Sequence, residues 1–282
     1  RKYSNFNSEK DMAFIEKTKN AINEATIITS KNRIKVFVWH HELEIPAGFA
    51  ETYPEICNDL GDIEVSHPIV RDFIENKIED FFFEYPLVDG IILTLHETRV
   101  PLLKLKNQKL DKVERVKYVT ELLYNACKKL GKELIVRPFA SIEEDYEMMT
   151  KAYEEISEDL PIMDKWTQFD WSLTLPHNTF FNKIKKNPLV IETDIFGEYF
   201  GKGRLPIMLK EHLKEKFLYC EKFAPLGYVN RIDRAGQHPF GDVNEVNIIM
   251  ATAYLSGNDP DEAANDFFRN KYLDAYEQVA QI

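Results

Sequence analysis

Three acidic residues, Glu97, Asp170 and Glu198, lie at or just beyond the end of short apolar runs that are typical of buried β-strands. Paired carboxyl groups suit the hydrolysis of a glycosidic bond, because a protonated acid delivers a proton to the leaving oxygen while an ionised one activates water or acts as nucleophile. Acids that face one pocket also raise each other's proton affinity. The alternative for each residue is a solvated loop acid. We therefore treat the three as candidate catalytic residues.

The tryptophans Trp39, Trp166 and Trp171 also lie at predicted strand ends. Indole rings offer apolar faces on which sugars stack, although packing in the core or at a barrel rim would place them there equally well. Arg137 and Lys165 lie near the ends of neighbouring predicted strands, where they either pair with the acids or hold a substrate carboxylate. These residues predict a sugar-binding pocket at the strand ends.

Histidines raise the question of a metal site. His40, Glu42, His96 and His177 could in principle surround one divalent ion. No HExxH motif and no HxH pair supports this, and the alternative is that the histidines bond to a sugar or to the protein itself. We predict neither a metal nor a cofactor, and a metal-dependent barrel hydrolase or isomerase remains an alternative function.

Six apolar, partly β-branched runs alternate with segments of helical periodicity, and no two runs are close enough for a tight hairpin. A doubly wound sheet would require a glycine-rich phosphate loop after its first strand, and none is present. We therefore predict an α/β fold, a (β/α)8 TIM-type barrel whose first strand is missing. The barrel is expected over residues 1–257, and the start of a C-terminal helical region over 258–282. Strands are predicted at residues 34–39, 88–95, 133–139, 161–166, 189–194 and 226–232.

The chain has 282 residues, 44% of them hydrophobic, and a formal net charge of −11. A nucleic-acid backbone or an anionic membrane requires a basic protein face, so we expect neither as a partner. No apolar segment approaches the length of a membrane span and no signal peptide is visible, which leaves cytoplasm, periplasm and extracellular space open. Cys57, Cys127 and Cys220 are odd in number and have no CxxC spacing, so we predict free, structural thiols.

At these residues the chain resembles the catalytic barrel of the α-glucuronidases, family 67 of the glycoside hydrolases. The likeness covers residues 34–268 and is strongest at a Glu-Tyr-x-Gly segment and at a lysine followed five residues later by Asp-Trp. The chain departs from the family where Trp166, Thr167 and Gln168 replace an Asn-Gly-Pro before the aspartate. The matching segments are residues 90–97, 134–139, 165–171, 192–201 and 238–239, followed by a helix and Asp259-Pro260.

The resemblance implies an inverting, exo-acting hydrolase of a glycan that bears a uronic acid. It assigns Glu97 as the general acid, and Asp170 and Glu198 as the pair that activates water. Arg137 and Lys165 would hold the uronate carboxylate. A carbohydrate-binding barrel without turnover is the main alternative. The remaining predicted substrate contacts are Trp39, His40, His96, Trp171, His177, Tyr199 and His238.

Overall fold

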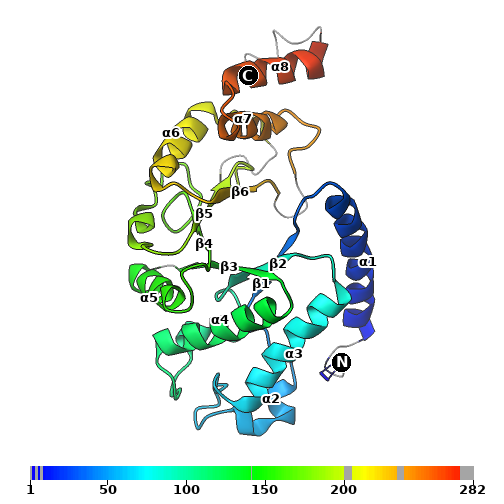
Figure 1. Cartoon of the computed structure of the whole chain (residues 1–282), viewed down its shortest axis with the longest axis vertical. Helices are drawn as coiled ribbons and strands as arrows, with labels where there is room; N and C mark the ends of the chain where they lie inside the picture. Colours follow the sequence, from blue (N-terminus) through cyan, green and yellow to red (C-terminus); the bar gives the residue numbers. More distant parts are fainter. Residues whose placement is uncertain are drawn as a thin grey trace. The chain divides into compact units, whose positions relative to one another are not determined.

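The computed structural model describes residues 2–3, 6, 9–140, 142–199, 205–233 and 238–273 (Figure 1). The chain divides into two compact units. The first unit comprises Arg1–Ile162 and Lys186–Pro188, and the second comprises Met163–Lys185 and Leu189–Ile282. The predicted domain boundary near residue 257 stays a prediction.

The strands are β1 (Phe37–His41), β2 (Gly90–Thr94), β3 (Glu133–Arg137), β4 (Ile162–Lys165), β5 (Leu189–Asp194) and β6 (Gly227–Arg231). They form one sheet in sequence order, and the pairs β1–β2, β2–β3, β3–β4 and β5–β6 are parallel. Sequential parallel strands joined through helices are the arrangement of a (β/α) barrel. The predicted α/β fold of TIM-barrel type is therefore confirmed, with six strands in the described part of the chain.

The helices are α1 (Glu9–Lys31), α2 (Phe49–Thr52), α3 (Pro68–Glu84), α4 (Lys112–Lys129), α5 (Glu143–Glu154), α6 (Lys210–Cys220), α7 (Glu245–Leu255) and α8 (Pro260–Tyr272). Local sequence accounts for several of their starts. Asp111 and Glu114 form a capping box at α4, and Asp259 caps α8 ahead of a proline at its first position. Helix α1 has two acidic residues, Glu9 and Asp11, in its first turn and Lys31 at its end, which suits the direction of the helix dipole.

In the first unit, helix α4 packs against α3, α5 and strand β3. Strand β2 is buried at all five residues, as expected for a parallel strand covered on both faces. The first residue of β2 is Gly90, where a side chain has no room, because a Cβ there would lie 2.4 Å from the backbone oxygen of Glu133 on β3. The close approach of β2 and β3 thus favours glycine at this position.

The second unit has a core rich in aromatic residues. Phe217 of α6 stacks on Tyr254 of α7 with ring centroids 4.9 Å apart and also meets Trp166 edge-on. Trp166 and Trp171 are 1% and 2% exposed, so both rings pack in this core. Phe268 brings α8 into the same core.

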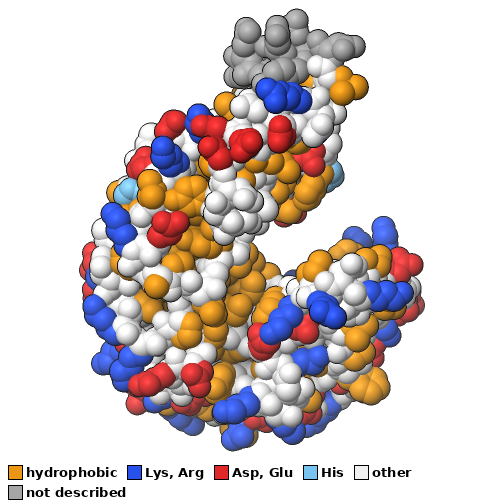
Figure 2. Space-filling model, turned by 45° about the horizontal axis from the view of Figure 1, so that its top comes forward, with side chains coloured by type: hydrophobic (Ala, Val, Ile, Leu, Met, Phe, Trp, Pro, Cys, Tyr) orange, Lys and Arg blue, Asp and Glu red, His pale blue; other side chains and the backbone are white. Residues whose placement is uncertain are grey.

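The described helices include none that is both long and apolar enough to cross a membrane. Figure 2 shows lysine, arginine, aspartate and glutamate side chains interspersed over the face in view.

Candidate functional site

The β1–β3 site lies at the C-terminal ends of three neighbouring strands in the first unit. Parallel strands end at one edge of the sheet, and the register here pairs His41 with Thr94 and Thr94 with Arg137. The last residues of β1, β2 and β3 are thus level with one another. We define the site as Trp39, His41, Thr94, His96, Arg137 and Phe139.

Arg137 is the charged group at the centre of this site. Its guanidinium carbon lies 4.8 Å from the ring centre of Trp39 and 4.6 Å from that of Phe139, while the residue as a whole is only 6% exposed. Aromatic faces attract a guanidinium through their quadrupoles, and more strongly where water is excluded. The two rings therefore hold a desolvated, planar cation in a defined orientation.

Trp39 gives the site a solvent-facing aromatic surface. Its indole nitrogen donates to the hydroxyl of Thr94 at 3.1 Å, which fixes the ring between β1 and β2. The residue is 39% exposed, unlike the other two tryptophans. A fixed and partly exposed indole offers apolar area at little entropic cost, and that suits a stacked sugar.

His96 supplies a neutral hydrogen-bonding group next to the arginine. The rings of His96 and Phe139 pack edge to face with centroids 5.8 Å apart. The backbone oxygen of His96 forms a hydrogen bond with Nδ1 of His41 at 2.8 Å. Burial, with a contribution from Lys104, lowers the pKa of His96 below its ordinary value. At neutral pH the imidazole is therefore uncharged and able both to donate and to accept a hydrogen bond.

A buried carboxylate anchors the end of β1. Glu42 is fully buried and bonds to Nε2 of His40 and to Nζ of Lys77, each at 2.7 Å. Burial alone would raise the pKa of Glu42, but Lys77 and His40 outweigh it and lower the pKa to about 2. The predicted sugar contact His40 thus has its Nε2 engaged by a protein carboxylate.

Glu97 follows β2 in an unusual backbone conformation. It has φ of 57°, in the left-handed region that non-glycine residues seldom adopt, and its side chain is exposed. Together with His96, Pro101 and Lys104 it lines a cavity of about 160 Å³. Such strain is often found where a side chain is aimed at a ligand. The role of Glu97 as general acid stays a prediction.

The other two predicted acids lie in the second unit, and both have partners there. Oδ1 of Asp170 lies 3.3 Å from Nζ of Lys165, and Oδ2 accepts from the Tyr199 hydroxyl at 2.8 Å. Glu198 forms an ion pair with Arg231 at 2.8 Å. The structure thus unites Lys165, Asp170 and Tyr199, whereas Glu97 and Arg137 belong to the first unit.

Lys165 is also bonded to the backbone oxygen of Phe169 at 2.8 Å and lies 5.0 Å from the ring centre of Trp171. Its ammonium group is therefore enclosed by the loop that follows β4. A single pocket that joins Arg137, Lys165 and all three acids stays a prediction.

Asp194 is a residue whose role the sequence analysis missed. Its buried carboxylate accepts hydrogen bonds from the backbone of Phe196, Gly197 and Glu198, at 2.9 to 3.0 Å. Burial raises the pKa of Asp194, and these hydrogen bonds oppose the rise. Its carboxylate shapes the loop that carries Glu198. The only signal in the sequence is the period-two spacing of Glu192 and Asp194 after an apolar run.

The remaining predicted contacts lie elsewhere in the second unit. The ring of His177 stacks on that of Tyr219 with centroids 4.1 Å apart, and its Nε2 lies 3.0 Å from Oε1 of Glu215. Burial, with a contribution from Lys216, lowers the pKa of His177. His238 lies 5.8 Å from the ring of Phe240. Within the described ranges, no three His, Cys, Asp or Glu side chains gather closely enough to hold a metal ion. The metal-dependent barrel hydrolase or isomerase, the alternative function, thus gains no support from the described residues.

No protein-family profile and no curated protein matches this sequence. Solved structures similar to the chain include two crystal forms of N-acetylneuraminate lyase from Mycoplasma synoviae. Form I is 15% identical over 83% of this chain and 80% of that chain, with a TM-score of 0.39. Form II is 14% identical over 75% of this chain and 76% of that chain, with a TM-score of 0.36.

These neighbours are lyases, and they correct the functional prediction from sequence. The resemblance to family 67 α-glucuronidases is wrong, and with it the prediction of a glycoside hydrolase that degrades polysaccharides. The motifs misled for a physical reason. Parallel barrels of many activities place acids, aromatic rings and cations at their strand ends, because their loops build the site there.

Proposed function

We propose that this chain binds a carbohydrate that carries a carboxylate, and that the β1–β3 site is where it binds. The observation that carries the proposal is Arg137, a cation 6% exposed between two aromatic rings at the C-terminal ends of the strands. Barrel proteins place their ligand sites at this end.

Arg137 would contact the carboxylate. A guanidinium presents a planar set of donors that matches the two oxygens of a carboxylate, and charged hydrogen bonds of this kind are about twice as strong as neutral ones. Trp39 and Phe139 already limit the orientations of its head group. Little side-chain entropy is then lost when an anion binds.

Trp39 and His96 would contact the sugar itself. The partly exposed indole offers a face to the C–H groups of a pyranose, and the neutral imidazole of His96 exchanges hydrogen bonds with its hydroxyls. Cation, ring and neutral imidazole together favour a sugar acid, such as a uronic acid, over a neutral sugar.

Tryptophan fluorescence tests this directly. Trp166 and Trp171 are 1% and 2% exposed, so a ligand that changes the emission without unfolding the protein reports mainly on Trp39. Glucuronate and N-acetylneuraminate should change the emission in a saturable way. Glucose and glucuronamide, which lack the negative charge, should bind at least about tenfold more weakly.

A matched pair of arginine variants separates the site from general charge. Arg137→Gln should weaken glucuronate binding about 10- to 100-fold, corresponding to about 1.5–3 kcal/mol for a charge-assisted contact. Arg71→Gln removes the same charge from the exposed surface of α3, where Arg71 pairs with Glu75, and should leave binding unchanged. Equal affinities for glucuronate and glucuronamide, or equal losses in both variants, would contradict the proposal.

A further inference from the structure

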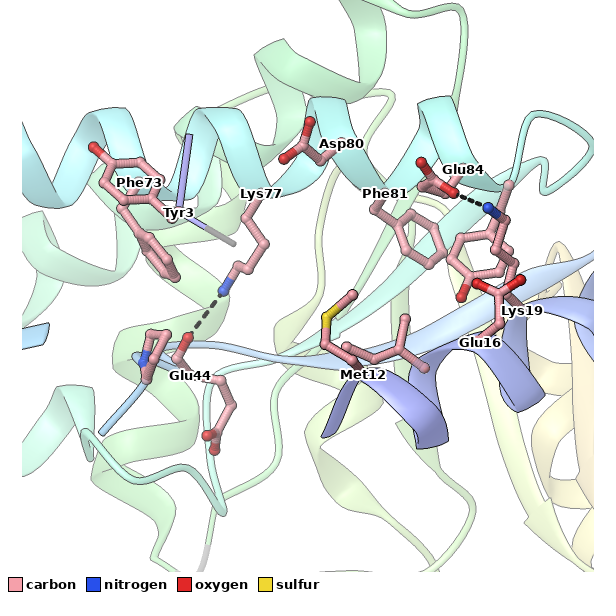
Figure 3. Close-up of a pocket in the computed structure, with 13 residues that line it drawn as sticks. Tyr3, Met12, Glu16, Lys19, Glu44, Phe73, Lys77, Asp80, Phe81 and Glu84 are labelled. Atoms are coloured by element: carbon pink, nitrogen blue, oxygen red, sulfur yellow. Dashed lines mark hydrogen bonds and ion pairs between the residues drawn. The ribbon is translucent and has the colours of Figure 1, made fainter. Parts of the chain in front are cut away.

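A second cavity lies in the first unit, and none of the six residues of the β1–β3 site lines it. It has a volume of about 370 Å³ and is lined by α1, by α3 and by the segment after β1 (Figure 3). This volume is at the lower end of the range for small-molecule sites, about 300–1,000 Å³. We call it the α1–α3 cavity.

The wall of the α1–α3 cavity is largely aromatic and aliphatic. The ring centroids of Phe81 and Tyr85 lie 4.9 Å apart, and those of Phe73 and Tyr3 lie 5.3 Å apart. In Figure 3 the side chains of Phe81 from α3 and Met12 from α1 extend into the space between the two helices. Rings of this kind bind both apolar groups and cations.

The charges around the cavity are unbalanced toward the negative. Four carboxylates and two ammonium groups line it. Lys19 forms an ion pair with Glu84. Lys77 bonds to Oε1 of Glu42, outside the lining, at 2.7 Å and to the backbone oxygen of Glu44 at 3.2 Å. Both lysines are thus engaged by groups of the protein.

The carboxylate of Glu44 accepts a hydrogen bond from the backbone N–H of Arg99 at 3.0 Å, so Glu16 and Asp80 are the two lining carboxylates that remain. In the described part of the chain, neither forms a hydrogen bond or an ion pair. They come from opposite walls, Glu16 from α1 and Asp80 from α3. An apolar, ring-lined cavity flanked by two such carboxylates complements a ligand with an apolar body and a positive charge.

We propose that the α1–α3 cavity binds an organic ammonium ion with an aromatic body. The aromatic body would fill the space among Phe73, Phe81 and Met12, and the ammonium group would lie toward Asp80 and Glu16. Anions are disfavoured because the lysines there are already neutralised. The proposal does not depend on the sugar-acid site and uses none of its residues.

Phenethylamine is the probe for this proposal, and calorimetry on the full chain is the measurement. Saturable binding is expected, with an affinity at least about tenfold higher than that of 2-phenylethanol or 3-phenylpropanoate, which share the ring but are neutral and anionic. Glucuronate at saturating concentration should leave phenethylamine binding unchanged. Absence of binding, or equal binding of the three compounds, would overturn the proposal.

Variants place the probe in this cavity. The double change Glu16→Gln, Asp80→Asn keeps the shape and removes both charges, and should weaken phenethylamine binding at least about tenfold. Glu79→Gln is the matched control, since Glu79 on α3 pairs with Lys129 and does not line the cavity. Ile15→Trp should fill the cavity and abolish binding, with folding checked by circular dichroism. Unchanged affinity in the double variant and in Ile15→Trp would show that phenethylamine binds elsewhere.

Discussion

At the strand ends of the first unit, Arg137 lies between two rings and Trp39 remains 39% exposed, whereas in the second unit Lys165 is bonded to Asp170 and both tryptophans are buried. The two sets of residues are alike in type and in position along their strands. Their surroundings differ, because in the second unit Phe217 and the loop after β4 enclose the rings and the lysine. A cation beside a tryptophan therefore indicates a ligand site only where an aromatic face reaches solvent.

The largest difference between the regions should appear when their tryptophans are truncated. Trp166→Ala leaves a void in the aromatic core and should lower the free energy of unfolding by about 3–5 kcal/mol. Trp39→Ala loses one hydrogen bond and a partly exposed ring, so the loss should stay below about 2 kcal/mol. Urea unfolding measures both. Equal losses would mean that Trp39 belongs to the core and not to a binding surface.

The next effect concerns acid stability and the buried carboxylate beside the β1–β3 site. The pKa of Glu42 is about 2 in the folded protein against an ordinary value of 4.5. A group whose pKa is lowered by folding stabilises the protein above its unfolded pKa and loses that contribution as the pH falls through its folded pKa. Between about pH 5 and pH 2 this group alone should account for a loss of about 3 kcal/mol.

Glu42→Gln isolates that contribution. The variant should be about 2–3 kcal/mol less stable at pH 7, because Lys77 and His40 lose their charged partner, and it should converge with the parent protein as the pH falls. Urea titrations at several pH values give the difference. Glu75→Gln, at an exposed position on α3, is the control. A difference that stays constant with pH would contradict the lowered pKa.

A smaller effect is expected at the ion pair of the second unit. Glu198→Gln weakens the contact with Arg231, which is partly exposed, and should cost about 1 kcal/mol of stability. Because this carboxylate already has a protein partner, glucuronate affinity should be unchanged. A loss of affinity comparable to that of Arg137→Gln would place Glu198 in the sugar-acid site and remove the distinction between the two regions.

The smallest effect should come from the surface of α3. Arg71 and Glu75 form an exposed pair one helical turn apart. Replacing Arg71 with Gln should change the free energy of unfolding by about 0.5 kcal/mol or less, because exposed pairs are screened by water and salt. Thermal unfolding at low and high salt checks this. A loss above about 1 kcal/mol would disqualify Arg71→Gln as a neutral control for Arg137→Gln.

The sequence by itself determined the fold class. Six apolar runs separated by helical segments favour a parallel sheet, and all six strands form within a few residues of their predicted bounds. Local residues also account for the starts of α3 and α8, which have Pro68 and Pro260 in their first turns. These features depend on neighbouring residues, so the linear order contains the necessary information.

Only the tertiary structure decided which strand-end residues face solvent. Trp39, Trp166 and Trp171 are equivalent in the sequence, yet residues distant along the chain bury two of them and leave one exposed. The same holds for the charges, because the partners of Glu42 and Glu198, Lys77 and Arg231, lie 35 and 33 positions away. The α1–α3 cavity likewise exists only where two distant helices meet. Exposure and pairing are properties of long-range packing, and strand periodicity does not encode them.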